Sequence, residues 1–183
     1  APKPRQGLPQ KVGWGRANSE DLISQINGPH AHVFWGANAN PYASKFNGSN
    51  LLSQIRKQLK SAKKKDGQIV SLLVAHDNNV LNITGLIESQ WRLAGYPRNE
   101  VPPGAGIAFE LWKKANGKRY VTVVVRAQSL SQLRDVTKLT AGGTEPHSVD
   151  LTEQVCGRNK CPYTKMMKTL KQAIFKDCVA KGS

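Results

Sequence analysis

The residues best placed to do acid–base chemistry in this chain form one polar tetrad, His76-Asp77-Asn78-Asn79. An imidazole can contact an anion such as a phosphoryl group, and a neighbouring carboxylic acid can deliver a proton to a leaving group. Asp and Asn are also frequent at the start of a helix, where free N–H groups attract anions. The tetrad is therefore a candidate site, although the same residue types are ordinary turn and capping residues.

Two elements should position this tetrad. The apolar run before it, bounded by a lysine-rich turn, predicts an interior strand from Gln68 to Ala75 that is buried on both faces. Apolar residues at helical spacing after it predict a helix from Asn79 to Gln90. His76 and Asp77 would then lie at the carboxyl end of the strand, where open α/β sheets hold their ligands.

The segment Ala75-His76-Asp77-Asn78-Asn79 resembles the His-Asp motif of the histidine acid phosphatases, the family of the bacterial phytases and glucose-1-phosphatases. The resemblance covers nearly the whole chain and is closest to the phytase type. The other segments that carry it follow in family order: Gly7-Leu8-Pro9, Gly13-Trp14-Gly15-Arg16, Trp91, Pro102-Pro103-Gly104, Phe109-Glu110-Leu111-Trp112, Gln132-Leu133-Arg134-Asp135 and the Cys156/Cys161 loop.

The chain also departs from the family pattern. The family's nucleophilic histidine lies in an Arg-His-Gly motif, and this sequence contains no Arg-His-Gly. The position after the His-Asp pair, commonly Thr or Ser, is Asn78, and the usual Gly-Gly pair is Gly104-Ala105. Where the family has an Arg-Thr-Pro run, the chain reads Ala37-Asn38-Ala39-Asn40-Pro41. By resemblance, 1–183 is a single partial domain, the C-terminal half of a histidine acid phosphatase.

The resemblance implies an α/β fold, the C-terminal part of a histidine-phosphatase (phosphoglycerate-mutase-like) sheet flanked by helices. It implies hydrolysis of a phosphorylated small molecule through a phosphohistidine, with the nucleophile in the missing N-terminal half. His76 and Asn78 would contact the phosphate, and Asp77 would be the general acid. No metal or other cofactor is implied, and the protein would be periplasmic or secreted, with any signal peptide before the missing half.

Composition leaves two further functions open. The 183 residues carry a net charge of +15, which implies attraction to anions. A non-catalytic anion-binding module would need only that charge and a helix N-terminus. Nucleic-acid binding is the least favoured alternative, because the four tryptophans are scattered and no known nucleic-acid motif is present. No apolar run approaches the roughly 20 residues that a membrane span needs.

Three cysteines bear on the compartment. A disulfide could close the short loop between Cys156 and Cys161, and Cys178 is left over. In the resembling family a C-terminal cysteine like Cys178 pairs with the N-terminal half. The alternative is a reduced cytosolic protein with three inert thiols. A zinc site is disfavoured, because no paired Cys/His cluster supplies four ligands.

The remaining pattern predicts elements along the whole chain. We expect an extended arm over 1–16, a helix that starts at Ser19-Glu20-Asp21 and ends at Asn27-Gly28-Pro29, and a surface strand or turn around His30 and His32 rather than a metal pair. We expect a second helix from Asn47-Gly48-Ser49-Asn50. We expect a β-hairpin near 106–126, after a Pro- and Gly-rich loop over 94–104. Further elements are a short helical turn over 129–133, a strand over 149–155 and a helix over 163–175.

Overall fold

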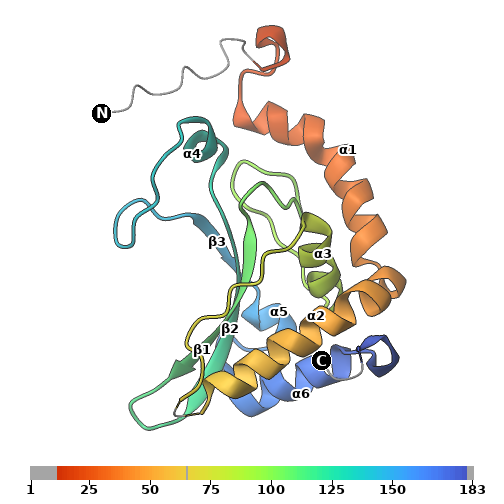
Figure 1. Ribbon diagram of the computed structural model, residues 1–183. Coiled ribbons are helices and arrows are strands. Elements are labelled where there is room, and N and C mark those ends of the chain that lie inside the picture. The colour runs from red at the N-terminus through yellow and green to blue at the C-terminus, as the bar shows by residue number, and fades with distance from the viewer. Residues whose placement is uncertain (1–11, 65, 181–183) are drawn as a thin grey trace.

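A computed structural model of the protein describes residues 12–64 and 66–180, and Figure 1 shows its elements. The helices and strands follow one another in the order η1 (Val12–Gly15), α1 (Glu20–Ala39), α2 (Pro41–Ala62), α3 (Asp77–Leu86), β1 (Gly106–Lys113), β2 (Arg119–Ala127), α4 (Leu130–Arg134), β3 (His147–Asp150), α5 (Thr152–Cys156), β4 (Cys161–Pro162), α6 (Tyr163–Ala173) and η2 (Lys176–Cys178). The predicted mixed α/β class, a sheet flanked by helices, is confirmed.

The sheet is antiparallel and is built on the predicted hairpin. β1 pairs with β2 along its full length, from Gly106 opposite Arg126 to Lys113 opposite Arg119. Gly117 has a φ of +79°, which a glycine adopts without strain, and the Lys118 N–H donates to Asn116 Oδ1 at 3.1 Å. β3 and the two-residue β4 both pair with β2, so β1 is an edge strand.

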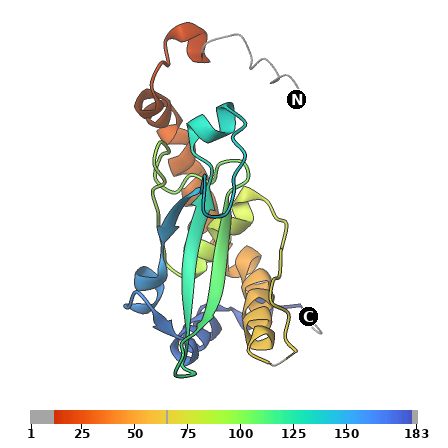
Figure 2. The same cartoon turned by 90° about the vertical axis from the view of Figure 1, so that its left-hand side faces the viewer.

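One face of β2 and the helices form the core. Alternate residues of β2 are almost fully buried, as the period of two in a half-buried strand requires: Val121, Val123, Val125 and Ala127. The helices α1, α2, α3, α5 and α6 lie to one side of the hairpin in Figure 1, and Figure 2 looks onto the opposite side. Their fully buried side chains, Leu52, Leu81, Ile83, Met166 and Leu170, complete this core.

Helix α1 starts where the sequence predicts but continues well beyond the predicted end. The Ser19 hydroxyl accepts the Leu22 N–H at 3.1 Å, as an N-cap should. The prediction that Asn27-Gly28-Pro29 ends the helix is wrong, because α1 runs through Pro29 to Ala39. Proline removes one backbone donor, but packing beyond it holds the helix: His30 stacks on Phe34, and α1 packs against α3. His30 and His32 therefore lie on a helix and not on a strand or turn.

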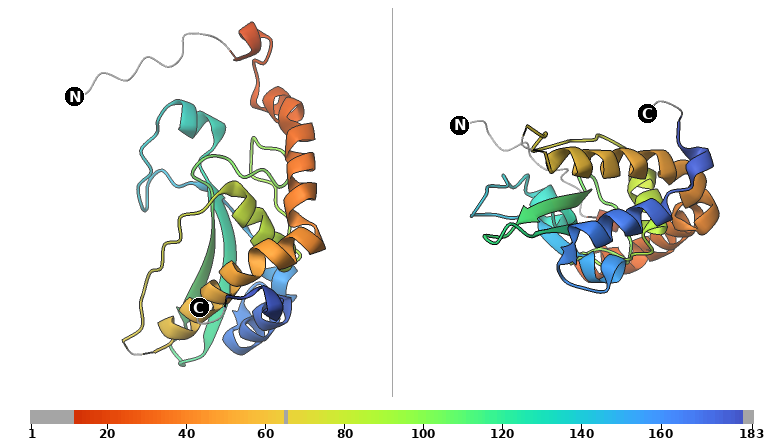
Figure 3. Two further views of the ribbon diagram at one scale, coloured as in Figure 1. Left: turned by 45° about the vertical axis from the view of Figure 1, so that its right-hand side comes forward. Right: turned by 90° about the horizontal axis from the view of Figure 1, so that it is seen from below.

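Helix α2 begins earlier than predicted. Its N-cap is Asn40, whose Oδ1 accepts the Ala43 N–H at 2.9 Å, and Pro41 follows in the first turn. The predicted start at 47–50 lies inside the helix, because the small residues Ser44 and Gly48 pack closely against α3 and hold this first half in place. Figure 3 shows α2 running beside α6, seen from below in its right-hand panel.

Two glycines let α3 approach α2 and the end of α1. A Cβ on Gly85 would overlap Ser44 Oγ and lie 2.6 Å from the Ala39 carbonyl oxygen. A Cβ on Gly48 would lie 2.9 Å from Leu86 Cδ1 and 3.1 Å from the Asn82 carbonyl oxygen. The position of α3, and with it the position of the tetrad at its start, therefore depends on these two close contacts.

The predicted interior strand from Gln68 to Ala75 is wrong. These residues are exposed and irregular, and the side chains of Ile69, Leu72 and Val74 are 96%, 84% and 93% exposed. Figures 2 and 3 show the segment as a separate trace that passes outside the sheet. An apolar run becomes a strand only when neighbouring strands accept its backbone hydrogen bonds, and none of the described residues pairs with it. We call residues 69–74 the apolar strip.

The C-terminal third largely follows the prediction. The helical turn α4 and the helix α6 form where expected. The strand predicted over 149–155 is partly wrong: β3 ends at Asp150, and 152–156 are the helix α5, whose Thr152 N–H is capped by Asp150 Oδ1 at 2.8 Å. Cys156 and Cys161 are bonded to each other and Cys178 is free, as predicted.

Most of the predicted extended arm over 1–16 lies outside the described residues, and its described end contains the short helix η1. Within the described part of the chain, no helix combines the length and the apolar composition that crossing a bilayer requires.

Candidate active site

The tetrad lies at the start of α3, but not at the end of a strand. His76 is the N-cap with an extended backbone, and its N–H donates to Asn79 Oδ1 at 3.0 Å. Helix α3 then begins at Asp77 and ends at Leu86, which confirms the predicted helix with both ends shifted toward the N-terminus. The three candidate residues His76, Asp77 and Asn78 are therefore consecutive at one helix end, and all three are exposed.

Hydrogen bonds fix the backbone of this turn. Asp77 Oδ1 accepts the Asn78 N–H at 2.8 Å, which orients the carboxylate over the first turn. Asn82, which is buried, donates from Nδ2 to the Asn78 carbonyl oxygen at 2.7 Å. Such an arrangement offers an acid, an imidazole and a carboxamide at the positive end of a helix dipole, which suits an anion.

Two residues distant in sequence lie close to this helix end. The pKa of the Glu100 carboxyl is raised above its ordinary value, first by burial and also by the charge of Asp77. A hydrogen bond from the Asn27 side chain and the charge of His30 act in the opposite direction. Glu100 is therefore close enough to Asp77 for their charges to interact, and Asn27 and His30 of α1 lie beside Glu100.

The loop that carries Glu100 is anchored by one buried tryptophan. The Trp91 indole N–H donates to the Glu100 carbonyl oxygen at 3.0 Å, and its backbone N–H donates to Asn99 Oδ1 at 3.0 Å. The Asn99 N–H in turn donates a hydrogen bond to the Trp91 carbonyl oxygen at 2.9 Å. Trp91 is only 3% exposed, so the position of Glu100 beside the site is set by the core.

Sequence reasoning did not find Glu100 as a neighbour of the tetrad, or His30 as a neighbour of Glu100. Glu100 is far from Asp77 along the chain and comes near it only through the anchored loop. The one signal in the sequence is the Pro- and Gly-rich loop over 94–104, because such a loop ahead of a strand is either the edge of a substrate cleft or a plain connector. Among the described residues, no group of three His, Cys, Asp or Glu side chains is placed to hold a metal ion.

Comparison with known proteins adds independent information. The family described as the histidine phosphatase superfamily (branch 2) matches residues 20–126, which include the tetrad, Glu100 and the hairpin. A curated relative is the phytase AppA of Escherichia coli, 30% identical over a match that covers 82% of this chain and 36% of the relative.

Solved structures agree with the family match. The Hafnia alvei phytase in complex with myo-inositol hexakis sulphate is 30% identical, with a TM-score of 0.83 over 96% of this chain and 46% of that chain. The Citrobacter braakii phytase is 28% identical, with a TM-score of 0.82 over 96% of this chain and 47% of that chain. The chain thus spans less than half the length of each of these relatives.

Proposed function

Because this chain belongs to branch 2 of the histidine phosphatase superfamily, we propose that it supplies the His-Asp part of an acid phosphomonoesterase of the phytase type. The observation that carries the proposal is the position of His76, Asp77 and Asn78 at the start of α3, inside the segment that the family matches. The nucleophilic histidine comes from the missing N-terminal half, since this sequence contains no Arg-His-Gly.

In this proposal each residue of the tetrad has a distinct task. His76 and Asn78 contact the phosphate, with the N-terminus of α3 behind them. Asp77 gives its proton to the leaving oxygen as the phosphorus–oxygen bond breaks and the phosphohistidine forms. Water then attacks the phosphohistidine, and the Asp77 carboxylate takes up the proton that this water loses. Glu100, whose charge interacts with that of Asp77, contributes to the charge around this acid.

The proposed partners and cellular compartment follow from the same phosphomonoesterase proposal. The substrate is a phosphorylated small molecule and the protein partner is the N-terminal half. A periplasmic or secreted location is supported by the Cys156–Cys161 disulfide, because such bonds persist in oxidising compartments.

Activity on two substrate classes tests this proposal. We expect the 183-residue chain alone to be inactive on phosphomonoesters, because it lacks the nucleophile. Together with the half that carries Arg-His-Gly it should release phosphate at acidic pH, and Asp77→Asn should abolish most of that release. The loss should be larger for alkyl than for aryl phosphates, because a good leaving group needs the acid least. Asp177→Asn, an exposed carboxylate in η2, is the matched control and should keep full activity.

Two outcomes would contradict the proposal. Robust turnover by the chain alone would mean that another residue is the nucleophile. Phosphate binding without turnover by the joined halves would favour the second candidate, a non-catalytic anion-binding module, which the net charge of +15 and the exposed helix end support. Nucleic-acid binding has less support, because Trp91 is buried and its indole N–H is already bonded to Glu100.

A further inference from the structure

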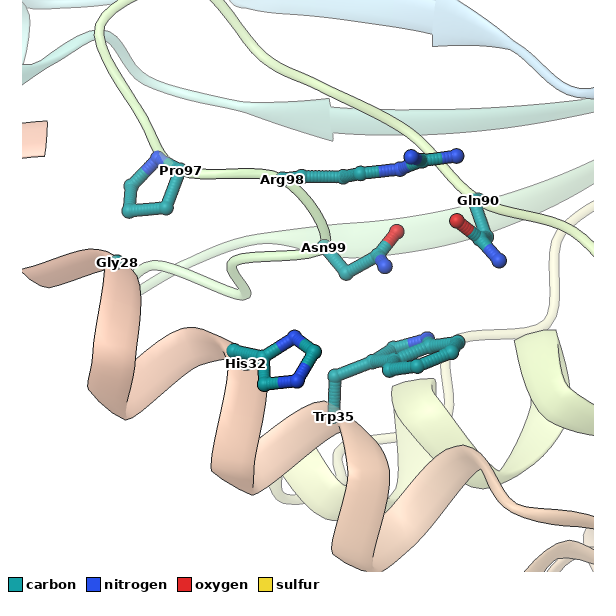
Figure 4. A pocket seen from close by; sticks show the side chains of 7 residues that line it. All are labelled: Gly28, His32, Trp35, Gln90, Pro97, Arg98 and Asn99. Carbon is teal, nitrogen blue, oxygen red and sulfur yellow. The ribbon is translucent and has the colours of Figure 1, made fainter. Parts of the chain in front are cut away.

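A cavity of about 530 Å³ lies between α1 and the loop over 90–99, and no role has been given to it so far. Figure 4 shows it from close by. His32 and Trp35 form its floor on α1, while Arg98 and Asn99 approach from the loop and Gln90 closes one end. Its size falls within the range of small-molecule sites, roughly 300–1,000 Å³.

The cavity contains a donor without an acceptor. Trp35 Nε1 is buried and has no hydrogen-bond partner among the described residues. An indole N–H can only donate, and buried polar groups in native proteins are nearly always paired. Figure 4 shows this nitrogen on the edge of the ring that faces Asn99 and Arg98, just beneath the cavity surface, so a small shift of the ring or of a neighbouring side chain would let a molecule in the cavity accept its hydrogen.

The polar lining includes Arg98 and Asn99, whose available groups are donors, and Gln90 and His32, which can donate or accept. Arg98 donates only, and its guanidinium extends along the loop toward Gln90 in Figure 4. Asn99 Oδ1 already accepts the Trp91 backbone N–H, so the group that Asn99 can offer is Nδ2, which Figure 4 shows on the side of Trp35. No Asp or Glu lines the cavity. Convergent donors with a cation and no acid form a site for an oxyanion.

The lining is held in place before any ligand arrives. Asn99 has a φ of +61°, a left-handed conformation that asparagine tolerates better than most residues, and the bonds to Trp91 lock it. Asn99 is 5% exposed, whereas Arg98 beside it is exposed, so this turn directs one side chain inward and the other across the cavity. A fixed donor set loses little entropy on binding.

We propose that this cavity is a phosphate-binding subsite formed by Arg98, Trp35 and Asn99, separate from the phosphate contacts of His76 and Asn78. Free phosphate and the phosphate group of an ester present the same oxygens to these donors. Glu100, the next residue after Asn99, lies near enough to Asp77 for the two charges to interact. The loop that carries Arg98 and Asn99 therefore also carries the residue whose charge interacts with Asp77, and only this link to the active site rests on the proposed function.

The indole signals of the full 183-residue chain report on the cavity directly. The chain has four tryptophans, and the signal missing in Trp35→Phe identifies the Trp35 N–H in a two-dimensional NMR spectrum. Inorganic phosphate is added at constant ionic strength, and glycerol 2-phosphate is added in a second series. We expect a saturable shift of the Trp35 signal in both series and no shift of Trp112, whose indole donates to Thr122. Tighter binding of the ester would identify the ester as the natural source of the phosphate.

Two arginines of the same loop provide the variant and its control. Arg98→Gln should weaken phosphate binding roughly tenfold or more, because a charge-assisted and often bidentate bond is lost. Arg98→Lys should recover part of it. Arg92→Gln removes the same charge from an exposed residue that does not line this cavity, and it should bind like the unchanged protein.

The remaining outcomes separate this inference from the proposed function. His76→Ala should leave the Trp35 shift unchanged. If His76→Ala abolishes phosphate binding while Arg98→Gln does not, the cavity is not a subsite and the proposed function stands. Equal weakening by Arg92→Gln and Arg98→Gln would show attraction to net charge alone and would overturn the inference, as would a Trp35 signal that does not move.

Discussion

At the residue scale, the candidate site combines three residues that are adjacent in the chain with others that come near them only through the fold. His76, Asp77 and Asn78 are adjacent in the chain, so their grouping at one helix end needed no knowledge of the fold. Glu100, His30, Arg98 and Trp35 reach the same region only because α1 packs against α3 and Trp91 anchors the loop. Contacts of that kind depend on tertiary packing, and a single sequence carries no local pattern for them.

The raised pKa of Glu100 makes a testable contribution to stability. The folded protein binds this proton more tightly than the unfolded chain, whose carboxyl has the ordinary value of 4.5. The favourable contribution is therefore complete below 4.5 and is lost as the pH rises through the folded pKa. We expect Glu100→Gln to match the unchanged protein in urea unfolding at low pH and to become relatively more stable as the pH rises.

Glu153→Gln, a change at an exposed carboxylate of α5, is the control for this experiment and should show no such trend. A stability difference between Glu100→Gln and the unchanged protein that stays constant across the pH range would mean that the carboxyl of Glu100 is not held in a buried setting.

At the element scale, predictions succeeded where the local signal and the packing agree. The hairpin has a turn residue at its tip and β-branched residues on β2, and α6 has an apolar side at helical spacing. The predictions failed where the local sequence signal and the tertiary packing disagree. Pro29 suggested an end to α1 that the packing overrides, and the apolar composition of the apolar strip suggested a strand that has no partner strand among the described residues.

The close approach of α3 to its neighbours predicts the effect of two glycine substitutions. Gly85→Ala would place a methyl group against Ser44 and the Ala39 carbonyl, and we expect it to lower the free energy of unfolding by about 1–3 kcal/mol. Gly36→Ala on exposed α1 meets nothing within 4 Å and should raise stability by about 0.5–1 kcal/mol through helix propensity.

Urea unfolding monitored by circular dichroism measures both variants. Equal stability of the two alanine variants would mean that α3 does not pack against α2 and the end of α1 as described. If Gly85→Ala is destabilised, the backbone amide NMR signals of His76 and Asp77 should also shift, because these residues begin the same helix.

At the scale of the whole molecule, the net positive charge can be counted directly from the sequence. The 27 lysines and arginines outnumber the 12 acids, yet the described residues contain one ion pair, Arg126 with Glu110 at 2.6 Å on the outer side of the hairpin. Most of the positive charge is therefore not neutralised by neighbouring carboxylates, and its mutual repulsion opposes the compact state. How that charge is distributed in space was not predictable, because it depends on the helix packing.

This repulsion predicts that salt stabilises the protein. Raising NaCl from about 10 to about 150 mM shortens the screening length from roughly 30 to roughly 8 Å, so the midpoint of urea unfolding should rise. Removing two exposed cations of α6 with Lys168→Gln and Lys171→Gln should raise the midpoint at low salt and flatten its dependence on salt. A midpoint that is independent of salt, or that falls, would contradict the view that repulsion governs stability.

The apolar strip also has a consequence for handling the protein. The six residues Ile69-Val70-Ser71-Leu72-Leu73-Val74 carry no charge and no proline, and the five apolar side chains among them are 48–96% exposed. Short uncharged segments of this composition are the ones that stack between chains into cross-β fibrils. Flanking charges counteract such stacking, and the lysine-rich turn before the strip places them there in the sequence. The solubility of the isolated chain therefore depends on the balance between this segment and its basic neighbours, and an acidic polymer or a high salt concentration would shift that balance toward aggregation.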